Sequence, residues 1–217
     1  MELPNNLNHS IDWKKLDEVI KTGLGNEKSG HDYEHTLRVL SIALEIAKTE
    51  EVDLDVLVAA CLLHDIAFKS GFAKDYHLRG AEEAEPILIE IGFPTDKIQA
   101  VKIAIEDHVG MIGQPIRTES SLQIESKILR DADNIDALGA VGLIRQISFC
   151  IQNKIPYFKS IEDGLNDSIY GGTKEILTWP DKMLLPQSKL MAEKRTEIMK
   201  KFIEELKEEN KDLYNKK

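Results

Sequence analysis

Eight consecutive apolar residues, Val56 to Leu63, occupy the middle of a segment whose helical periodicity extends from Asp53 to Ala67. A helix that is apolar on every side has to be buried on every side. The rest of the sequence contains no alternating pattern of useful length for a β-strand, and helical periodicity is found nearly everywhere. We therefore predict an all-α fold, a helical bundle in which this segment is buried.

The polar and apolar spacing predicts several other helices. They are expected at Ile11–Thr22, at Tyr33 to about Glu50, at about His77–Glu90, at Thr95–His108 with Thr95 as the cap, at Ser121 to about Asn153, and at Gln187 to about Glu208. Asp32 is well placed to cap the second of them. Pro86 is expected to kink or break its helix, and Gly139 and Gly142 indicate a bend or close packing. Residues 156–186 are expected to be irregular, either a lid or a long connection.

The chain has 217 residues, which is long for one average domain and short for two. We expect a single domain over residues 1–217. Its core is expected at about 28–150, and residues 156–208 are expected to form a C-terminal extension made of the irregular segment and the last helix.

The two cysteines, Cys61 and Cys150, lie far apart, each inside an apolar run. This is no disulfide framework, and it suits a reducing cytoplasm. The first ten residues are polar and contain Pro4, so no signal peptide is expected. No apolar stretch is long enough to cross a bilayer, and we expect no membrane partner.

The chain carries 38 acidic and 28 basic residues, a formal net charge of -10. This charge argues against binding of nucleic-acid polymers, which requires clustered lysine and arginine. It does not exclude small phosphorylated substrates, because a bound metal ion can reverse the sign of the field locally.

The pair His64-Asp65 directly follows the buried apolar run. Burial of a carboxylate without a partner costs several kcal/mol, so another group has to compensate it. From the residues alone, either an ion pair with helix-end hydrogen bonds or a metal ion satisfies this requirement.

Two further segments place metal-ligand residue types in apolar surroundings. His35 falls at the start of the apolar stripe of its helix rather than on the charged face. Downstream, the carboxylates of Asp131, Asp133 and Asp136 lie within six residues and repel one another. A nearby cation explains this arrangement, and a solvated cluster of carboxylates at a helix start is the alternative.

The order of these residues resembles the signature of the HD superfamily. His35, then His64-Asp65, then the Ala-Asp-x-Ile element at 132–135 form that signature, and the match extends loosely over about residues 28–206. His31 through Val39 and Asp133 through Arg145 also resemble motifs of a bacterial and archaeal branch that includes nucleotide pyrophosphatases. The resemblance implies an HD-domain helical bundle.

The resemblance also implies that His35, His64, Asp65 and Asp133 bind one divalent ion, namely Mn, Fe, Ni, Co, Zn or Mg. Metal-bound water would attack phosphorus in a nucleotide or another small phosphate ester. Asp65 would take part in catalysis, and Asp131 or Glu34 would accept the proton. Asp131 and Asp136 are otherwise expected behind the ligands or on the substrate side.

His77 and His108 correspond in position to additional histidines of binuclear HD proteins. They are therefore candidate ligands of a second ion, with Asp65 bridging. The alternative for His108 is that it stabilises a helix C-terminus without any metal.

Phosphate binding requires cations, and Arg38, Lys69 and Arg79 are the candidates, with Arg38 and Lys69 also assigned to catalysis. Arg38 lies three residues after His35, so both project from one helix face. Arg145 is a further candidate, and ordinary surface salt bridges are the alternative for each.

Cys61 is expected to be a buried thiol rather than a metal ligand. Tyr170 and Trp179 are expected to fill the domain edge rather than stack on a base.

Three functions are therefore considered. The first is a metal-dependent phosphohydrolase with a small phosphorylated substrate, preferably a nucleotide. The second is a binuclear hydrolase or oxygenase, with a diiron centre as one form, that uses His77 and His108. The third is a non-catalytic nucleotide sensor.

Overall fold

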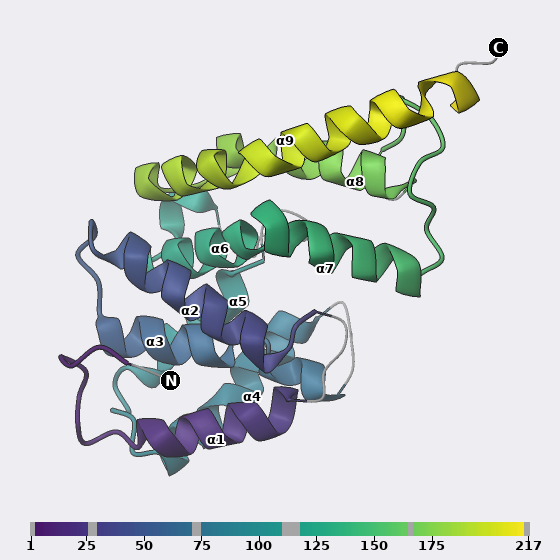
Figure 1. Cartoon of the computed structure of the whole chain (residues 1–217). Coiled ribbons are helices and arrows are strands. Elements are labelled where there is room, and N and C mark those ends of the chain that lie inside the picture. The colour runs from purple at the N-terminus through teal and green to yellow at the C-terminus, as the bar shows by residue number, and fades with distance from the viewer. Residues whose placement is uncertain (1–2, 26–29, 71–74, 110–117, 165–166, 215–217) are drawn as a thin grey trace. The chain divides into compact units, whose positions relative to one another are not determined.

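The computed structural model describes residues 3–25, 30–70, 75–109, 118–164 and 167–214, with the side chains of 69, 70 and 212–214 excepted. Every regular element among these residues is a helix, which confirms the all-α fold (Figure 1). The chain divides into two compact units, residues 1–133 and 134–217. A single domain over the whole chain stays a prediction.

The first unit is built around one buried helix, α3 (Leu54–Leu63). The helices that pack against it are α1 (Trp13–Leu24), α2 (Tyr33–Ala47), α4 (Tyr76–Glu90) and α5 (Ile98–Asp107) (Figure 1). Residues 56–63 are at most 2% exposed. The predicted burial of this apolar run on all sides is thus confirmed.

Side-chain caps set the beginning of α2 and α3. Asp32 accepts a hydrogen bond from the backbone N–H of His35 at 2.8 Å and caps α2, as predicted. Asp53 caps α3 by accepting from the backbone N–H groups of Asp55 and Val56. The predicted cap of α5 was wrong, because the N-cap residue is Lys97 rather than Thr95, and it makes no side-chain capping hydrogen bond.

Helix α3 ends earlier than the predicted Ala67. The ring Nδ1 of His64 contacts the carbonyl oxygen of Cys61 at 2.8 Å. In a continuing α-helix, that carbonyl would accept from the backbone N–H of Asp65. The chain therefore turns at His64-Asp65 and continues as a 3₁₀ helix, η1 (Ile66–Ser70).

Helix α4 packs closely against this turn. A Cβ atom at Gly80 would lie 3.2 Å from the carbonyl oxygen of His64. The helix also continues through Pro86, so the break considered for it does not occur. Pro86 and Glu82 are both exposed, so the helix accommodates the missing hydrogen bond between them on its solvent side.

The single helix expected over 121–153 is two helices, preceded by a short 3₁₀ helix, η2 (Glu119–Ser121). These are α6 (Ile124–Asp136) and α7 (Gly139–Gln152). Gly139 has a φ of +79°, a left-handed conformation that other residues rarely adopt, and it allows the chain to turn here. Within the second unit, Arg195 donates from Nη1 to the carbonyl of Ile135 at 2.9 Å, next to this turn.

The second unit also contains α8 (Ile169–Ile176), η3 (Trp179–Lys182) and α9 (Pro186–Tyr214). Helix α9 packs against α7, α8 and η3 (Figure 1). The prediction that 156–186 is irregular was therefore wrong in part. The Ser168 hydroxyl caps α8 by accepting from the Gly171 N–H, and it donates to the carboxylate of Asp163 at 2.5 Å.

Among the described residues, no single helix is long and apolar enough to cross a membrane. The bent pair formed by α6 and α7 passes the length and composition test only when the two are taken together.

We expect Gly139→Ala to lower the free energy of unfolding by about 1–2 kcal/mol, because an alanine has to adopt the left-handed backbone conformation. A clash contributes little, since the nearest atom to the added Cβ would be 3.5 Å away. Urea unfolding measures the effect. Gly164→Ala is the control, because Gly164 is exposed and has no positive φ; equal stabilities of the two variants would contradict this explanation.

Candidate metal centre

Three segments of the first unit bring histidine and aspartate side chains together. His35 lies in the first turn of α2, His64 and Asp65 form the turn after α3, and Asp133 lies in the last turn of α6. His35 and His64 are fully buried, Asp65 is 1% exposed, and the side chain of Asp133 is 26% exposed. The centre is therefore buried, with access to solvent at Asp133.

The distances within this group are short. His35 Nε2 lies 3.3 Å from Asp133 Oδ1, 3.4 Å from Asp65 Oδ2 and 3.4 Å from His64 Nε2. His64 Nε2 lies 3.2 Å from Asp65 Oδ2. Neighbouring ligands about 2.1 Å from a common ion lie about 3.0–3.4 Å apart, so the spacing fits one metal ion.

A second observation also points to a cation-binding site. Asp65 Oδ1 is buried and has no hydrogen-bond partner among the described residues. A buried carboxylate oxygen without a partner is costly. Imidazole and carboxylate together suit a divalent transition metal, so both the donor types and the orphaned oxygen fit such an ion.

The charges of the group favour the ligand form of the carboxylates. Burial opposes ionisation of Asp65, but the charges of His64 and His31 outweigh it and hold its pKa well below the usual value. Burial likewise opposes ionisation of Asp133, and the hydrogen bond from His35 outweighs it and lowers the pKa. For His64, burial lowers the pKa, but Asp65 and then Asp133 raise it overall.

The imidazole of His64 is oriented for ligation. Its Nδ1 contacts a carbonyl oxygen, that of Cys61, which can only accept, so Nδ1 carries the proton. In the neutral ring, Nε2 then presents its lone pair to His35 and Asp65. The thiol of Cys61 is buried, and burial followed by the charge of Asp133 raises its pKa, so a thiolate ligand is disfavoured.

His31 joins the group, although the sequence reasoning used it only as part of a motif. Its Nδ1 lies 2.8 Å from Asp65 Oδ2, and its ring stacks on Phe68 with the centroids 4.0 Å apart. The ligand atoms of His31, His35 and Asp65 lie within 4.8 Å of one another. The spacing of the two histidines, four residues apart just before and inside a helix start, was the available sequence signal.

His77 and His108 lie outside both sets of three close ligand atoms found among the described residues. His108 is buried, with its ring centroid 5.2 Å from that of His64. Its Nε2 is 3.3 Å from the hydroxyl of Tyr76, and the Tyr76 ring also packs edge-on against His77. Sequence reasoning missed Tyr76, which had no distinguishing pattern.

The other candidates lie in varied positions. Asp131 is fully buried, and two residues along a helix place its side chain on another face from Asp133. Glu34 is exposed in the first turn of α2, and Arg38 is half-buried one turn further along. Arg79 donates to the carbonyl of Ala67 at 3.3 Å. The backbone of Lys69 lies in η1, and its side chain is outside the described residues.

The remaining candidates belong to the second unit. Arg145, a candidate for phosphate binding, forms an ion pair at 2.8 Å with the buried Asp136, which was expected behind the ligands or on the substrate side. Both side chains are therefore engaged with each other. Tyr170 and Trp179 are buried, which agrees with filling of the domain edge.

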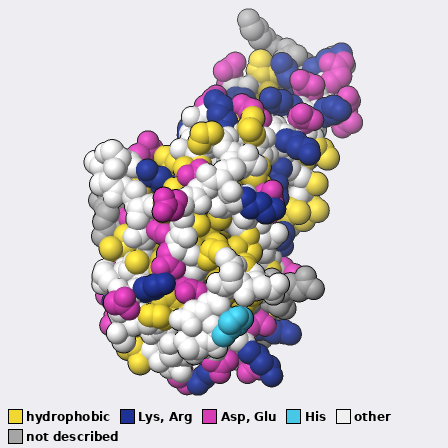
Figure 2. Space-filling view, turned by 90° about the vertical axis from the view of Figure 1, so that its left-hand side faces the viewer, with side chains coloured by type: hydrophobic (Ala, Val, Ile, Leu, Met, Phe, Trp, Pro, Cys, Tyr) yellow, Lys and Arg dark blue, Asp and Glu magenta, His cyan; other side chains and the backbone are white. Residues whose placement is uncertain are grey.

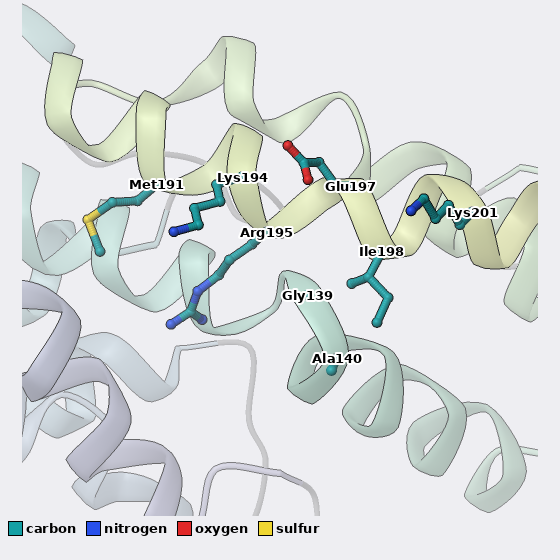
Figure 3. Close-up of a pocket in the computed structure, with 8 residues that line it drawn as sticks. All are labelled: Gly139, Ala140, Met191, Lys194, Arg195, Glu197, Ile198 and Lys201. Carbon is teal, nitrogen blue, oxygen red and sulfur yellow. The ribbon is translucent and has the colours of Figure 1, made fainter.

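A pocket in the second unit, shown in Figure 3, has different chemistry. Its volume is about 740 Å³, and it is lined by Gly139, Ala140, Met191, Lys194, Arg195, Glu197, Ile198 and Lys201. Glu197 is the one lining residue of a metal-binding type, so the pocket does not resemble the histidine and aspartate group.

On the molecular face in Figure 2, little histidine reaches the surface, in keeping with the burial of the histidine and aspartate group.

Comparison with known proteins gave consistent matches. The family model for the HD domain matches residues 32–138. The protein YpgQ of Bacillus subtilis is 28% identical over 188 residues, which cover 86% of this chain and 88% of YpgQ.

Two solved structures share the fold. The crystal structure of YpgQ in complex with ADP matches with a TM-score of 0.70 and 27% identity, covering 89% of this chain and 97% of the other. A Bacillus thuringiensis structure, described as an HD-superfamily hydrolase, matches with a TM-score of 0.70 and 26% identity, covering 91% and 96%.

We expect His31→Ala to weaken binding of Mn²⁺ by about 10- to 100-fold, the usual effect of losing a hydrogen-bond partner of a metal-binding carboxylate. The affinity is measured by titration of metal-free protein. His9→Ala is the matched control, because His9 is exposed. An unchanged affinity in the His31 variant would show that its contact with Asp65 does not serve metal binding.

Proposed function

We propose that this chain, whose residues 32–138 match the HD-domain family model, is a metal-dependent phosphohydrolase that acts on a nucleotide or another small phosphate ester. The observation that carries the proposal is the buried group of His35, His64, Asp65 and Asp133, with separations of 3.2–3.4 Å between the contacting ligand atoms. These four residues would hold one divalent ion.

The ion would lower the pKa of water and polarise the phosphoryl group. The chain supplies the geometry for this chemistry. Asp65 and Asp133 are held ionised, and the Nδ1 contact with the Cys61 carbonyl orients His64. Burial of His35, His64 and Asp65 keeps these side chains out of bulk water and strengthens the electrostatic interactions among them.

The substrate phosphates would be bound by Arg38 and Lys69. Arg38 lies one helical turn after His35 in α2, and such a spacing puts both side chains on one face. Lys69 follows the His64-Asp65 turn in η1. Arg79 is a weaker candidate, because its guanidinium binds the carbonyl of Ala67 and supports the chain after that turn.

Asp131 or Glu34 would accept a proton during the reaction. Asp131 is fully buried, and it lies on another face of α6 from Asp133. This position favours an indirect effect on the position of Asp133 over direct contact of Asp131 with the substrate. Glu34 is exposed beside His35 and can reach solvent. Glu34 is therefore the better placed of the two for direct proton transfer.

A nucleotide is the preferred substrate. YpgQ, a relative that covers most of this chain, has been crystallised in complex with ADP. The motif resemblance to nucleotide pyrophosphatases adds support, so nucleoside triphosphates are the first compounds to test.

Both cysteines are buried thiols, which suits the proposed reducing cytoplasm.

Two alternative functions are considered. His108 lies beside His64 and supports a binuclear centre as a second candidate. A non-catalytic nucleotide sensor would use the same group of histidine and aspartate residues, and it would bind nucleotide tightly without turnover.

We expect His64→Ala and Asp65→Ala each to abolish metal retention and turnover together, since each removes a ligand. Metal content by elemental analysis and release of phosphate or pyrophosphate from a nucleoside triphosphate panel measure the two effects. His9→Ala is the control for histidine replacement, and circular dichroism checks that each variant is folded. Normal turnover by either folded variant would exclude the proposed mechanism.

The product of wild-type turnover distinguishes the functions. Release of pyrophosphate or phosphate supports the hydrolase. Tight nucleotide binding with no product across the panel supports the sensor. Dioxygen uptake by a reduced iron form supports the oxygenase.

A further inference from the structure

The pocket in Figure 3 lies at the start of α7 and against one face of α9. Its volume of about 740 Å³ is in the range that accommodates a small organic molecule. All of its lining residues belong to the second unit, whereas the residues of the proposed metal centre belong to the first. The pocket therefore shares no residue with the metal centre.

The face of α9 that lines the pocket combines cations with an apolar side chain. Lys194, Ile198 and Lys201 are spaced four and three residues apart, so their side chains lie on the same face of the helix. Neither lysine forms an ion pair among the described residues. Ile198 is 49% exposed, so a ligand in the pocket can still bury it. The pocket thus offers positive charge and apolar surface side by side.

Arg195 lies close to the start of α7. Its Nη1 donates to the carbonyl of Ile135 at 2.9 Å, which fixes the guanidinium beside the turn between α6 and α7. A Cβ atom at Gly139 would lie 3.5 Å from the Cβ of Arg195, so the backbones of α7 and α9 approach each other here. Figure 3 shows Arg195 and Ile198 extending from α9 on the side that faces α7. A ligand at the start of α7 therefore meets an arginine that is already positioned.

The N-terminus of α7 adds positive potential to the same place, because the exposed N–H groups and the dipole of a helix favour anions there. Its N-cap residue, Leu138, makes no side-chain capping hydrogen bond. The Gly139 N–H contacts the sulfur of Met199 at 3.1 Å, and a thioether is a weak acceptor. Among the lining residues, Glu197 is the one acid beside three basic residues, so the lining is positive in a chain of net charge -10.

We propose that this pocket binds a small organic phosphate, with the phosphate at the start of α7 beside Arg195 and Lys194 and the apolar part against Ile198 and Met191. A phosphate group has several oxygens, so it can accept from a guanidinium, an ammonium and backbone N–H groups together. The ligand is bound there and not hydrolysed, since neither group of close metal-ligand atoms found among the described residues lines the pocket. The site goes beyond the proposed function, because binding requires neither the metal ion nor turnover.

The test is isothermal titration calorimetry of ADP into the full chain after its metal has been removed and the chelator desalted away. ADP is the probe because it joins phosphates to a largely apolar base. Circular dichroism checks that the metal-free protein and each variant are folded. We expect about one ADP per chain, and we expect Lys194→Ala combined with Lys201→Ala to weaken binding by at least about 10-fold, because charge-assisted hydrogen bonds are lost.

Lys200→Ala combined with Lys207→Ala is the matched control. Both lysines are exposed in α9, neither lines the pocket, and the pair removes the same charge. The control should leave the affinity for ADP unchanged. Equal weakening in the two double variants would overturn the proposal, because it would reveal attraction to the net charge alone.

Inorganic pyrophosphate tests the apolar part of the proposed ligand. ADP should bind more tightly than pyrophosphate, and Ile198→Ser should weaken the binding of ADP while leaving that of pyrophosphate unchanged. Pyrophosphate that binds as tightly as ADP would overturn the assignment to an organic phosphate.

The outcomes separate this site from the proposed function. A folded metal-free protein that does not bind ADP, or that binds it equally well without Lys194 and Lys201, would overturn the pocket and leave the phosphohydrolase standing. A wild type that retains no metal and has no turnover, but whose ADP binding is lost with the two lysines, would contradict the phosphohydrolase and support the pocket.

Discussion

The first unit is organised around the buried carboxylate of Asp65, whose negative charge requires partners from several segments of the chain. Its Oδ2 is approached by ring nitrogens of His31, His35 and His64 at 2.8–3.4 Å, while Oδ1 has no partner among the described residues. A buried charge is stable only with such partners. The segments that supply them, before and within α2 and at the end of α3, are therefore tied to the position of Asp65.

The sequence predicted much of this arrangement. The uninterrupted apolar run required a buried central helix, and the structure confirms it in α3. The ordered histidines and aspartates indicated the HD superfamily, and the family model for the HD domain matches residues 32–138, which contain all four of them. Of the predicted ligands, His35, His64 and Asp133 form one group of close ligand atoms, and His35 and Asp65 form a second group with His31.

What the sequence could not predict depends on contacts between distant segments or on side chains that compete with the backbone. The helix at α3 stops at Leu63 because the His64 ring takes a backbone carbonyl, an event that hydrophobic periodicity does not record. The short helix α8 depends on the Ser168 cap and on Asp163 behind it. The contact of Tyr76 with His108 joins residues 32 positions apart.

The burial of α3 on every side has a consequence for the unfolded chain. A run of eight apolar residues is prone to aggregate when a newly made polypeptide exposes it. Here acidic residues flank the run closely, with Asp53 and Asp55 before it and Asp65 after it. Charges at both ends oppose stacking of such segments. The residues that cap the helix and build the site therefore also act as gatekeepers that protect the chain before it folds.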